Sequence, residues 1–489
     1  MQSAFSALDW FIFGGYFLLL GVSSWLLSRT KINSSREYFV GSNTMPMFAV
    51  ALSVLATSQS AATFLGVPEY SYAHDFTFIG FYFSGLLGVI FVAFVLIPKF
   101  YEMQAVTVYE LLEKRYGESA KKQAGVMFLV GRVLASGARL YIGALAISMI
   151  LFGDILFFHM SLSIVILMLG ALAYTYFGGI KSIIFSDVIQ AITYVGAGIA
   201  VVVFLYYSLE NVNIIETLNA HNKLDFIDTS FDGKFNLFGL LSGWLLLNIA
   251  AFGLDQDMTQ RVLSCKNEKE AAKSLIVSLL LTIPVVLLFL VIGALLYLFY
   301  LQADIMQSFE GEKITIFMYY ILNEMPEGLR GLVTVGAIAA ALSSTNSVLG
   351  AMASVAVEDI YKPWKLKKGT IDEMHFVKAS RFAVVFFALV LTLMAMVSYF
   401  WQRYSDLSLI GFALGVMAFA YTGLLGVYFS AIFTKRGNSK TVPLALAAGF
   451  LSVLALQPYV FEIDIGFAWQ MLLGTIIAFG VMQLGASDA

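Results

Sequence analysis

The sequence predicts an all-α membrane protein that crosses the bilayer about thirteen times. Three observations predict this fold class: 60% of the 489 residues are hydrophobic, only 12% are charged, and long apolar runs recur along the whole chain. A soluble domain carries roughly 25% charged residues, so a chain this poor in charge could not cover a surface that faces water. The formal charge of −3 gives no reason to expect a nucleic-acid partner.

The expected spans are runs of about 20 mostly apolar residues, the length that a helix needs to cross the hydrocarbon core. In chain order they cover 8–28, 45–67, 76–98, 125–151, 160–177, 183–209, 238–253, 274–300, 332–357, 382–400, 407–433, 442–456 and 467–484. No polar stretch between them is long enough for a water-soluble domain. We therefore expect residues 1–489 to form one transmembrane domain.

The distribution of lysine and arginine predicts the orientation, because cytoplasmic loops carry an excess of both. When the loops are assigned to alternate sides, 5 of the 29 Lys and Arg residues lie on the side of the N-terminus and 22 on the other. A miscounted span would mix the two groups from that point on. We expect a multi-pass protein of a bacterial-type inner membrane, with its N-terminus outside and its C-terminus in the cytoplasm.

The second span carries a polar run, Thr57-Ser58-Gln59-Ser60, followed by Thr63. Small polar side chains can bond their own backbone and so compete with the helical ladder. Local unwinding would turn backbone carbonyls toward a bound cation. The alternative is a helix-packing face rich in Ser and Thr.

The ninth span contains five consecutive polar residues, 343–347, in the middle of an apolar helix. At about 100° per residue, Ala340, Ser343 and Ser344 share one arc, and Ser343, Asn346 and Ser347 share a second. Neutral oxygen ligands suit a hard monovalent cation better than a transition metal. A second helix would have to complete either site.

Three charged residues lie within the other apolar runs. Arg132 and Arg139, in the fourth span, are seven residues apart and point to nearly the same face. We expect Arg132 to bind a substrate carboxylate, with an internal ion pair or a snorkelling side chain as the alternative. Asp187 begins the sixth span and needs a cation or hydrogen-bond donors, unless it is an interfacial partner of Lys181.

Three stretches resemble the sodium:solute symporter family, and the resemblance extends over essentially the whole chain. They are segment 177–190, the run from Asp255 to Arg261, and the Ala-Ala-Leu-Ser-Ser run at 340–344. The bacterial sialic-acid and sugar symporters are the branch that the chain resembles. The family implies a LeuT-type fold with two inverted five-helix repeats, here 45–209 and 237–433, each beginning with a broken helix. Residues 8–28 would form a peripheral first helix, and 442–484 two peripheral C-terminal helices.

The resemblance also implies the ligands. The main sodium site would comprise carbonyls and hydroxyls of Ala56, Gln59, Ala340, Ser343 and Ser344. A second sodium site, present in some members, would comprise Asp187, Ser343, Asn346 and Ser347, with Asn346 at a position where the family pattern has serine. The substrate residues that match are Ser60, Thr63 and Arg132, with aromatic cover from Phe78 and Tyr82. Tyr82 stands where the sialic-acid branch has glutamine, which is a departure from that branch.

We therefore expect a sodium-coupled symporter that imports a carboxylate-bearing sugar or another organic anion by alternating access, using one or two sodium ions. A neutral sugar, an amino acid or a monocarboxylate remains an alternative cargo, and a proton carried by Asp187 is an alternative coupling ion. We expect no enzyme, because the spans show no paired acids and no His or Cys site, and no channel, because no pore-lining element repeats. The expected partners are the solute, sodium and membrane lipid, with no nucleic acid and no obligatory protein partner. No signalling domain is expected after the last span.

Overall fold

The computed structural model describes residues 5–27, 32–209, 213–231, 233–301, 308–309, 312–369, 371–405, 409–461 and 465–486. Most of these residues are helical. Apart from isolated bridges, their β-structure consists of a two-residue antiparallel pair, β1 (Ser308–Phe309) and β2 (Glu312–Lys313). The expected all-α fold class is confirmed.

The first half of the chain forms the first six predicted spans. Helix α1 (Ala7–Leu27) comes first, and α2 (Ser35–Val40) and η1 (Gly41–Asn43) lead to the second span. That span is divided into α3 (Met47–Ser58) and α4 (Ala61–Ala73), which are bent by 64°. The third consists of η2 (Thr77–Ile79), α5 (Gly80–Phe91), η3 (Val92–Leu96) and α6 (Ile97–Glu102). After α7 (Glu110–Tyr116) come α8 (Glu118–Ile147), η4 (Ser148–Phe152) and α9 (Phe157–Ser208).

Helix α9 contains both the fifth and the sixth predicted spans in 52 residues. A straight helix of that length would be about 78 Å long, against a hydrocarbon core of about 30 Å. The run is interrupted at Gly179, whose φ of 57° and ψ of −156° are not helical. A side chain there would also lie 2.6 Å from the carbonyl oxygen of Tyr38, so the position favours glycine.

The second half begins with a short polar connection, α10 (Ile214–Ala220), before the seventh span. That span consists of α11 (Leu237–Leu240), α12 (Gly243–Ile249) and η5 (Ala250–Leu254), followed by α13 (Gln256–Val262). Next come α14 (Glu268–Phe299), α15 (Ile316–Asn323) and the ninth span, made of α16 (Leu329–Ser354), η6 (Val355–Tyr361) and α17 (Lys362–Leu366). The last elements are α18 (Glu373–Ser405), α19 (Leu409–Phe433), α20 (Thr441–Ala455), α21 (Pro458–Phe461) and α22 (Phe467–Gln483).

Within the described residues, every predicted span falls on helical structure. Residues 28, 407 and 408, at the edges of the first and eleventh predicted spans, lie outside the described residues. Among the described residues, eight helices are long and apolar enough to cross a membrane, or nine when α3 and α4 count as one broken span. Helices α1, α20 and α22 are apolar but shorter within the described residues. The chain is therefore a polytopic helical membrane protein, and the number thirteen stays a prediction.

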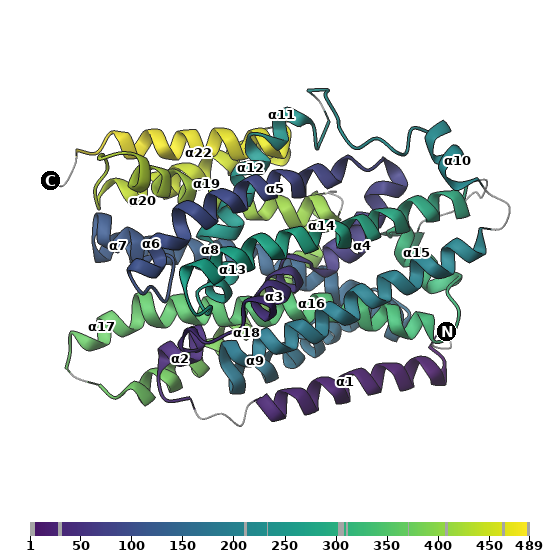
Figure 1. Ribbon diagram of the computed structural model, residues 1–489, viewed down its shortest axis with the longest axis horizontal. Coiled ribbons are helices and arrows are strands. Elements are labelled where there is room, and N and C mark those ends of the chain that lie inside the picture. Colours follow the sequence, from purple (N-terminus) through teal and green to yellow (C-terminus); the bar gives the residue numbers. More distant parts are fainter. Residues whose placement is uncertain are drawn as a thin grey trace.

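The loops gather at two ends of the bundle, as the alternating assignment requires. Figure 1 shows the N-terminus at the end that carries α10 and α15, and the C-terminus at the opposite end, near α6 and α7. Lys223 Nζ donates to the carbonyl of Tyr72 at 2.6 Å within the first group of loops. Lys367 Nζ pairs with Glu118 Oε2 at 2.6 Å within the second.

Helix α16 lies at the centre of the bundle, and α1 lies along one edge in Figure 1. In the most apolar part of the ninth span 94% of the residues are buried, against 39% in α9 and in α18. Helix α8 approaches α16 closely at Gly143, where a Cβ would lie 2.8 Å from that of Ala341. Small residues of this kind let membrane helices pack backbone to backbone.

Candidate functional site

The second span is broken at the polar run that the sequence singled out. The ladder of α3 ends where the amide of Gln59 donates to Leu55 O at 3.1 Å. The next amide, of Ser60, donates instead to Thr63 Oγ1 at 3.4 Å. Gln59 and Ser60 are both extended, with ψ of 136° and 173°. The predicted unwinding is therefore confirmed, and the carbonyl of Ala56 is released from the regular helical ladder.

The polar run of α16 packs against this break. Thr57 Oγ1 and Ser347 Oγ lie 3.1 Å apart and join α3 to α16. Ser344 Oγ donates within α16 to Ala340 O at 3.2 Å and to Ala341 O at 3.0 Å. Its hydroxyl proton is thus directed at the helix backbone, which leaves oxygen lone pairs for a cation.

The donor set predicted for the first sodium site consists of neutral oxygens of Ala56, Gln59, Ala340, Ser343 and Ser344, on α16 and at the break beside it. These residues are all buried. Among the described residues, no group of three or more His, Cys, Asp or Glu side chains could hold a metal ion. Neutral oxygens with few charges fit a hard monovalent cation, so the residues present fit sodium.

Three of the four residues of the second predicted sodium site are connected by hydrogen bonds, and the fourth, Asn346, is bonded elsewhere. Asp187 Oδ1 accepts a hydrogen bond from Ser343 Oγ at 3.0 Å, and Ser347 Oγ donates to Ser343 O at 2.6 Å. Asn346 is bonded elsewhere: in the amide orientation that satisfies both atoms, its nitrogen donates to Ala171 O and Leu342 O at 3.3 and 3.2 Å. Asp187, Ser343 and Ser347 are thus joined, and the Asn346 amide is held against helix backbone.

A residue not predicted for this site, Arg261 of α13, contacts two of its members. Its Nη2 lies 3.2 Å from Asp187 Oδ2 and also donates to Ser347 Oγ. Its Nε donates to Ser53 Oγ at 2.8 Å, and Ser53 Oγ donates to Asp187 at 2.5 Å. Arg261 is 0% exposed, although the charge count included it among the 22 loop residues on the side opposite the N-terminus. The alternative partner of Asp187, Lys181, pairs with Glu37 at 3.6 Å instead.

Arg132 lies in a buried ion-pair cluster at the start of α13. Its Nε donates to Asp255 Oδ1 at 3.1 Å, and its Nη2 contacts both Asp255 and Asp257, the latter at 3.3 Å. The Tyr421 hydroxyl also donates to Asp255. The internal ion pair, which was one of the two alternatives for Arg132, is therefore formed in this conformation. Its contact with a substrate carboxylate stays a prediction.

The other predicted substrate residues lie near the break. Ser60 is 4% exposed, and its backbone amide donates to Thr63 Oγ1, as described above. Phe78 and Tyr82 meet edge to face, with ring centroids 5.8 Å apart. The Tyr82 side chain interacts with that of Gln59 and lies in electrostatic range of Arg139. Tyr82 thus lies beside the break, whereas Arg132 has its partners at the start of α13.

The sequence contained one signal for the charged cluster at α13, but no function was predicted for its residues. The run from Asp255 to Arg261 was recognised as a family motif, and all seven of its residues are buried. Asp255 is extended and caps α13 by accepting the amide of Asp257 at 2.9 Å. The seventh span therefore ends at a break that is lined by buried charges. The break in the second span, where α3 ends, differs because it releases backbone carbonyls.

The model of the sodium:solute symporter family matches residues 38–449. The chain belongs to the sodium:solute symporter family. It is 27% identical to the sodium/sialic acid symporter NanT of Aliivibrio fischeri over 96% of this chain and 90% of that protein. It is 26% identical to the sodium/sialic acid symporter SiaT of Proteus mirabilis, over 95% and 92%. The human sodium/iodide cotransporter is 25% identical over 74% of this chain and 57% of its own length.

Solved structures support the fold. A Na+-coupled sialic acid symporter in a substrate-bound, outward-open state matches 99% of this chain with a TM-score of 0.83 at 23% identity. Mhp1, a nucleobase-cation-symport-1 transporter, matches 94% with a TM-score of 0.58 at 14% identity. The chain is thus a membrane transporter rather than an enzyme, and sodium is its coupling ion.

Proposed function

We propose that this protein imports a sialic acid or a closely similar carboxylate-bearing sugar together with sodium, by alternating access. The observation that carries the proposal is the break at Gln59 and Ser60, where α3 ends beside the polar run of α16 that holds Ser343 and Ser344. Thr57 Oγ1 and Ser347 Oγ lie 3.1 Å apart and join the two helices there. A sodium ion bound between them would hold α3 against α16. The two bacterial relatives named above as sialic acid symporters support the choice of cargo.

In the proposed cycle, sodium enters from outside and orders the broken helix beside Ser60, Thr63, Phe78 and Tyr82. Solute binding completes the pocket. Loss of sodium to a cytoplasm with little sodium then loosens the contact between α3 and α16, and the pocket opens inward. The buried pair of Arg132 with Asp255 would hold the inner side closed until that step, because separating it requires both charges to be rehydrated.

A single sodium ion per cycle is the second part of the proposal. The guanidinium of Arg261 contacts Asp187 and Ser347, which are two of the four residues of the second predicted sodium site. Asn346, a third, bonds to helix backbone. A fixed arginine thus supplies the positive charge that a second sodium would bring. It also gives Asp187 a permanent partner, which argues against Asp187 as a proton carrier.

The arrangement in the membrane is also proposed. Large apolar side chains on the outer faces, such as Phe11 at 77% and Phe382 at 74% exposure, support a surface surrounded by lipid. The lysine and arginine excess supports an outside N-terminus and a cytoplasmic C-terminus. The two broken helices, at Gln59 and at Asp255, open the proposed inverted repeats 45–209 and 237–433, with 8–28 and 442–484 peripheral. We also propose that the protein transports its solute without an obligatory protein partner.

The experiment is uptake of radiolabelled N-acetylneuraminic acid into proteoliposomes that contain the purified protein. An inward sodium gradient should drive uptake, and potassium in its place should not. Ser343→Ala should raise the sodium concentration for half-maximal uptake. Uptake that is equal with and without sodium would contradict the proposal.

A further inference from the structure

Arg139 is a cation at mid-membrane depth without a carboxylate partner among the described residues. It lies near the centre of the fourth predicted span, where burying an unpaired charge costs several kcal/mol. Its one hydrogen-bond partner in the described part of the chain is the thioether of Met417, 3.1 Å from Nη2. A thioether is a weak acceptor that cannot neutralise a guanidinium. Unlike Arg132, Arg139 therefore keeps most of its capacity to bind an anion.

The position of Arg139 on α8 places it beside the broken helix. Gly143, one turn further along the same face, would carry a Cβ 3.6 Å from that of Ala61, the first residue of α4. Tyr82, a predicted substrate residue, lies in electrostatic range of Arg139. Arg132 lies about 10 Å further along the helix, toward the cytoplasmic end. Of the two arginines, Arg139 is therefore the one at the level of the proposed pocket.

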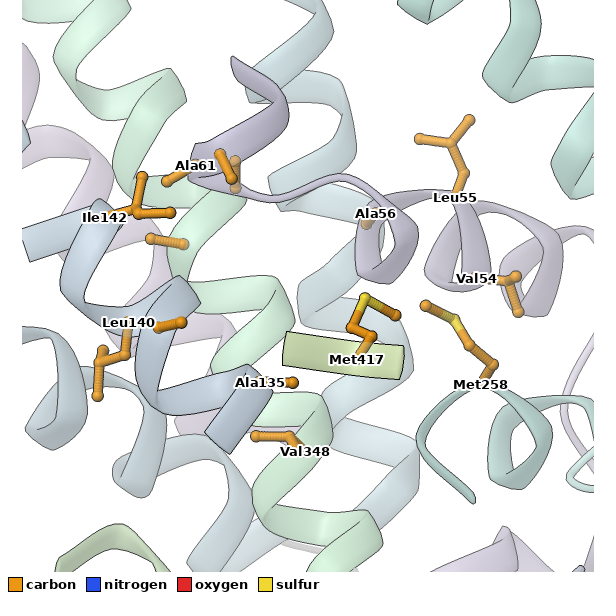
Figure 2. Packing of buried hydrophobic residues seen from close by; sticks show 14 of the residues in the cluster. Val54, Leu55, Ala56, Ala61, Ala135, Leu140, Ile142, Met258, Val348 and Met417 are labelled. Carbon is orange, nitrogen blue, oxygen red and sulfur yellow. The ribbon is translucent and has the colours of Figure 1, made fainter. Parts of the chain in front are cut away.

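Met417 lies on α19, which packs against α8 and against α4, the helix that follows the break. Figure 2 shows its side chain pointing toward Ala56 at the end of α3, with Ala135 of α8 beside it. Methionine is flexible and adapts to irregular spaces, so it can change rotamer without moving the backbone of α19. A group that displaced the Met417 sulfur would meet the Arg139 guanidinium directly.

An acidic group is the chemistry that this arrangement fits. Arginine presents a planar fork that matches a carboxylate with two parallel hydrogen bonds. Asp255 and Asp257 lie in electrostatic range of Arg139, but the electrostatic effect of Arg132 on Arg139 is larger. Both carboxylates are already paired with Arg132. If Arg139 served only as a remote counter-ion of these carboxylates, its replacement would affect acidic and neutral solutes equally. Binding of an acidic and a neutral solute therefore distinguishes the two roles.

We propose that Arg139, and not Arg132, binds the carboxylate of the transported solute, which displaces Met417 from the guanidinium. This inference rests on the proposed function and names the residue that selects an acidic cargo. Arg132 remains in its ion pair with Asp255 while the solute is bound.

The test compares N-acetylneuraminic acid with its neutral methyl ester, in binding to the purified full-length protein in sodium. In the unmodified protein, esterification should weaken binding roughly 10- to 100-fold, the range of a charge-assisted hydrogen bond. Arg139→Gln should weaken binding of the acid by a similar factor and leave the ester unchanged. Arg115→Gln, a control whose Nη2 donates to Thr434 O at 3.4 Å in a loop, should bind both as before. Arg139→Lys, which keeps the charge, should lose less of the affinity for the acid.

Sodium-dependent thermal stabilisation without solute reports whether each variant is folded. If Arg139→Gln shows no such stabilisation, the comparison of acid and ester is made in Arg139→Lys instead. We expect Arg139→Lys to prefer the acid over the ester by a smaller factor than the unmodified protein does. Equal loss for acid and ester, or acid binding that survives in Arg139→Gln and disappears in Arg132→Gln, would overturn the assignment. Absence of sodium-dependent binding in the unmodified protein would refute the proposed function instead.

Discussion

The charge moved per transport cycle follows from what occupies the second predicted sodium site. If Arg261 is the permanent partner of Asp187, one sodium ion enters with one monovalent anion, and no net charge crosses the membrane. A sodium gradient of about tenfold would then accumulate the solute about tenfold at any voltage. With two sodium ions, the same gradient and about 100 mV would support roughly 5,000-fold, since each net charge contributes about 2.3 kcal/mol.

The assay is solute accumulation in proteoliposomes whose membrane potential is set with potassium and valinomycin. We expect accumulation that follows the sodium gradient and does not change when the potential is varied. Accumulation that rises with an inside-negative potential, or an inward current with N-acetylneuraminic acid, would refute the account of one sodium ion.

The matching perturbation is Arg261→Gln. Removing the guanidinium leaves Asp187 as an unpaired buried carboxylate, at a cost of about 3–5 kcal/mol. A sodium ion that enters in its place would offset part of this cost. The sodium dependence of thermal stability should therefore become steeper in Arg261→Gln, and it should stay unchanged in the control Lys181→Gln, whose partner is Glu37. An unchanged dependence in Arg261→Gln would show that no cation enters.

Three further predictions concern other parts of the molecule. Asp9→Ala should destabilise the protein by about 1–3 kcal/mol, because Asp9 Oδ1 accepts two backbone amides at the start of α16, at 2.8 and 2.7 Å; a melting temperature equal to that of the unmodified protein would contradict this. Arg132→Gln should cost about 3–5 kcal/mol, and adding Asp255→Asn should restore part of that stability, whereas strictly additive losses would argue against a coupled pair. Burial raises the pKa of the Cys265 thiol to about 12, so maleimide should label this single cysteine slowly at pH 7 and rapidly after denaturation; equal rates would contradict the packing.

Much of the fold could be predicted from the sequence because apolar runs and loop charges are local signals. The break in the second span was predictable for the same reason, since Thr57, Ser58 and Gln59 interrupt an apolar helix. The interruption of α9 at Gly179 falls in the gap between the fifth and sixth predicted spans, so its place was also predictable, whereas the continuation of helical structure on both sides of it was not.

The roles of the buried charges depended on contacts between distant segments. Arg261 follows an apolar span and resembles a loop residue, yet α13 packs against α3 and α16, and this packing buries Arg261 beside Asp187. Arg132 and Arg139 share one face of one helix, so nothing local separates them. The separation comes from α13, which brings Asp255 to Arg132, and from α19, which brings only the thioether of Met417 to Arg139.

The most direct test of the central claim is the sodium requirement of uptake in the unmodified protein and in Ser343→Ala. The account predicts that an imposed sodium gradient drives accumulation of N-acetylneuraminic acid, and that Ser343→Ala needs a higher sodium concentration for the same rate. The reason is that the Ser343 hydroxyl would be both a sodium ligand and a donor to Asp187 at 3.0 Å. Uptake that proceeds equally without sodium, in either protein, would contradict the account.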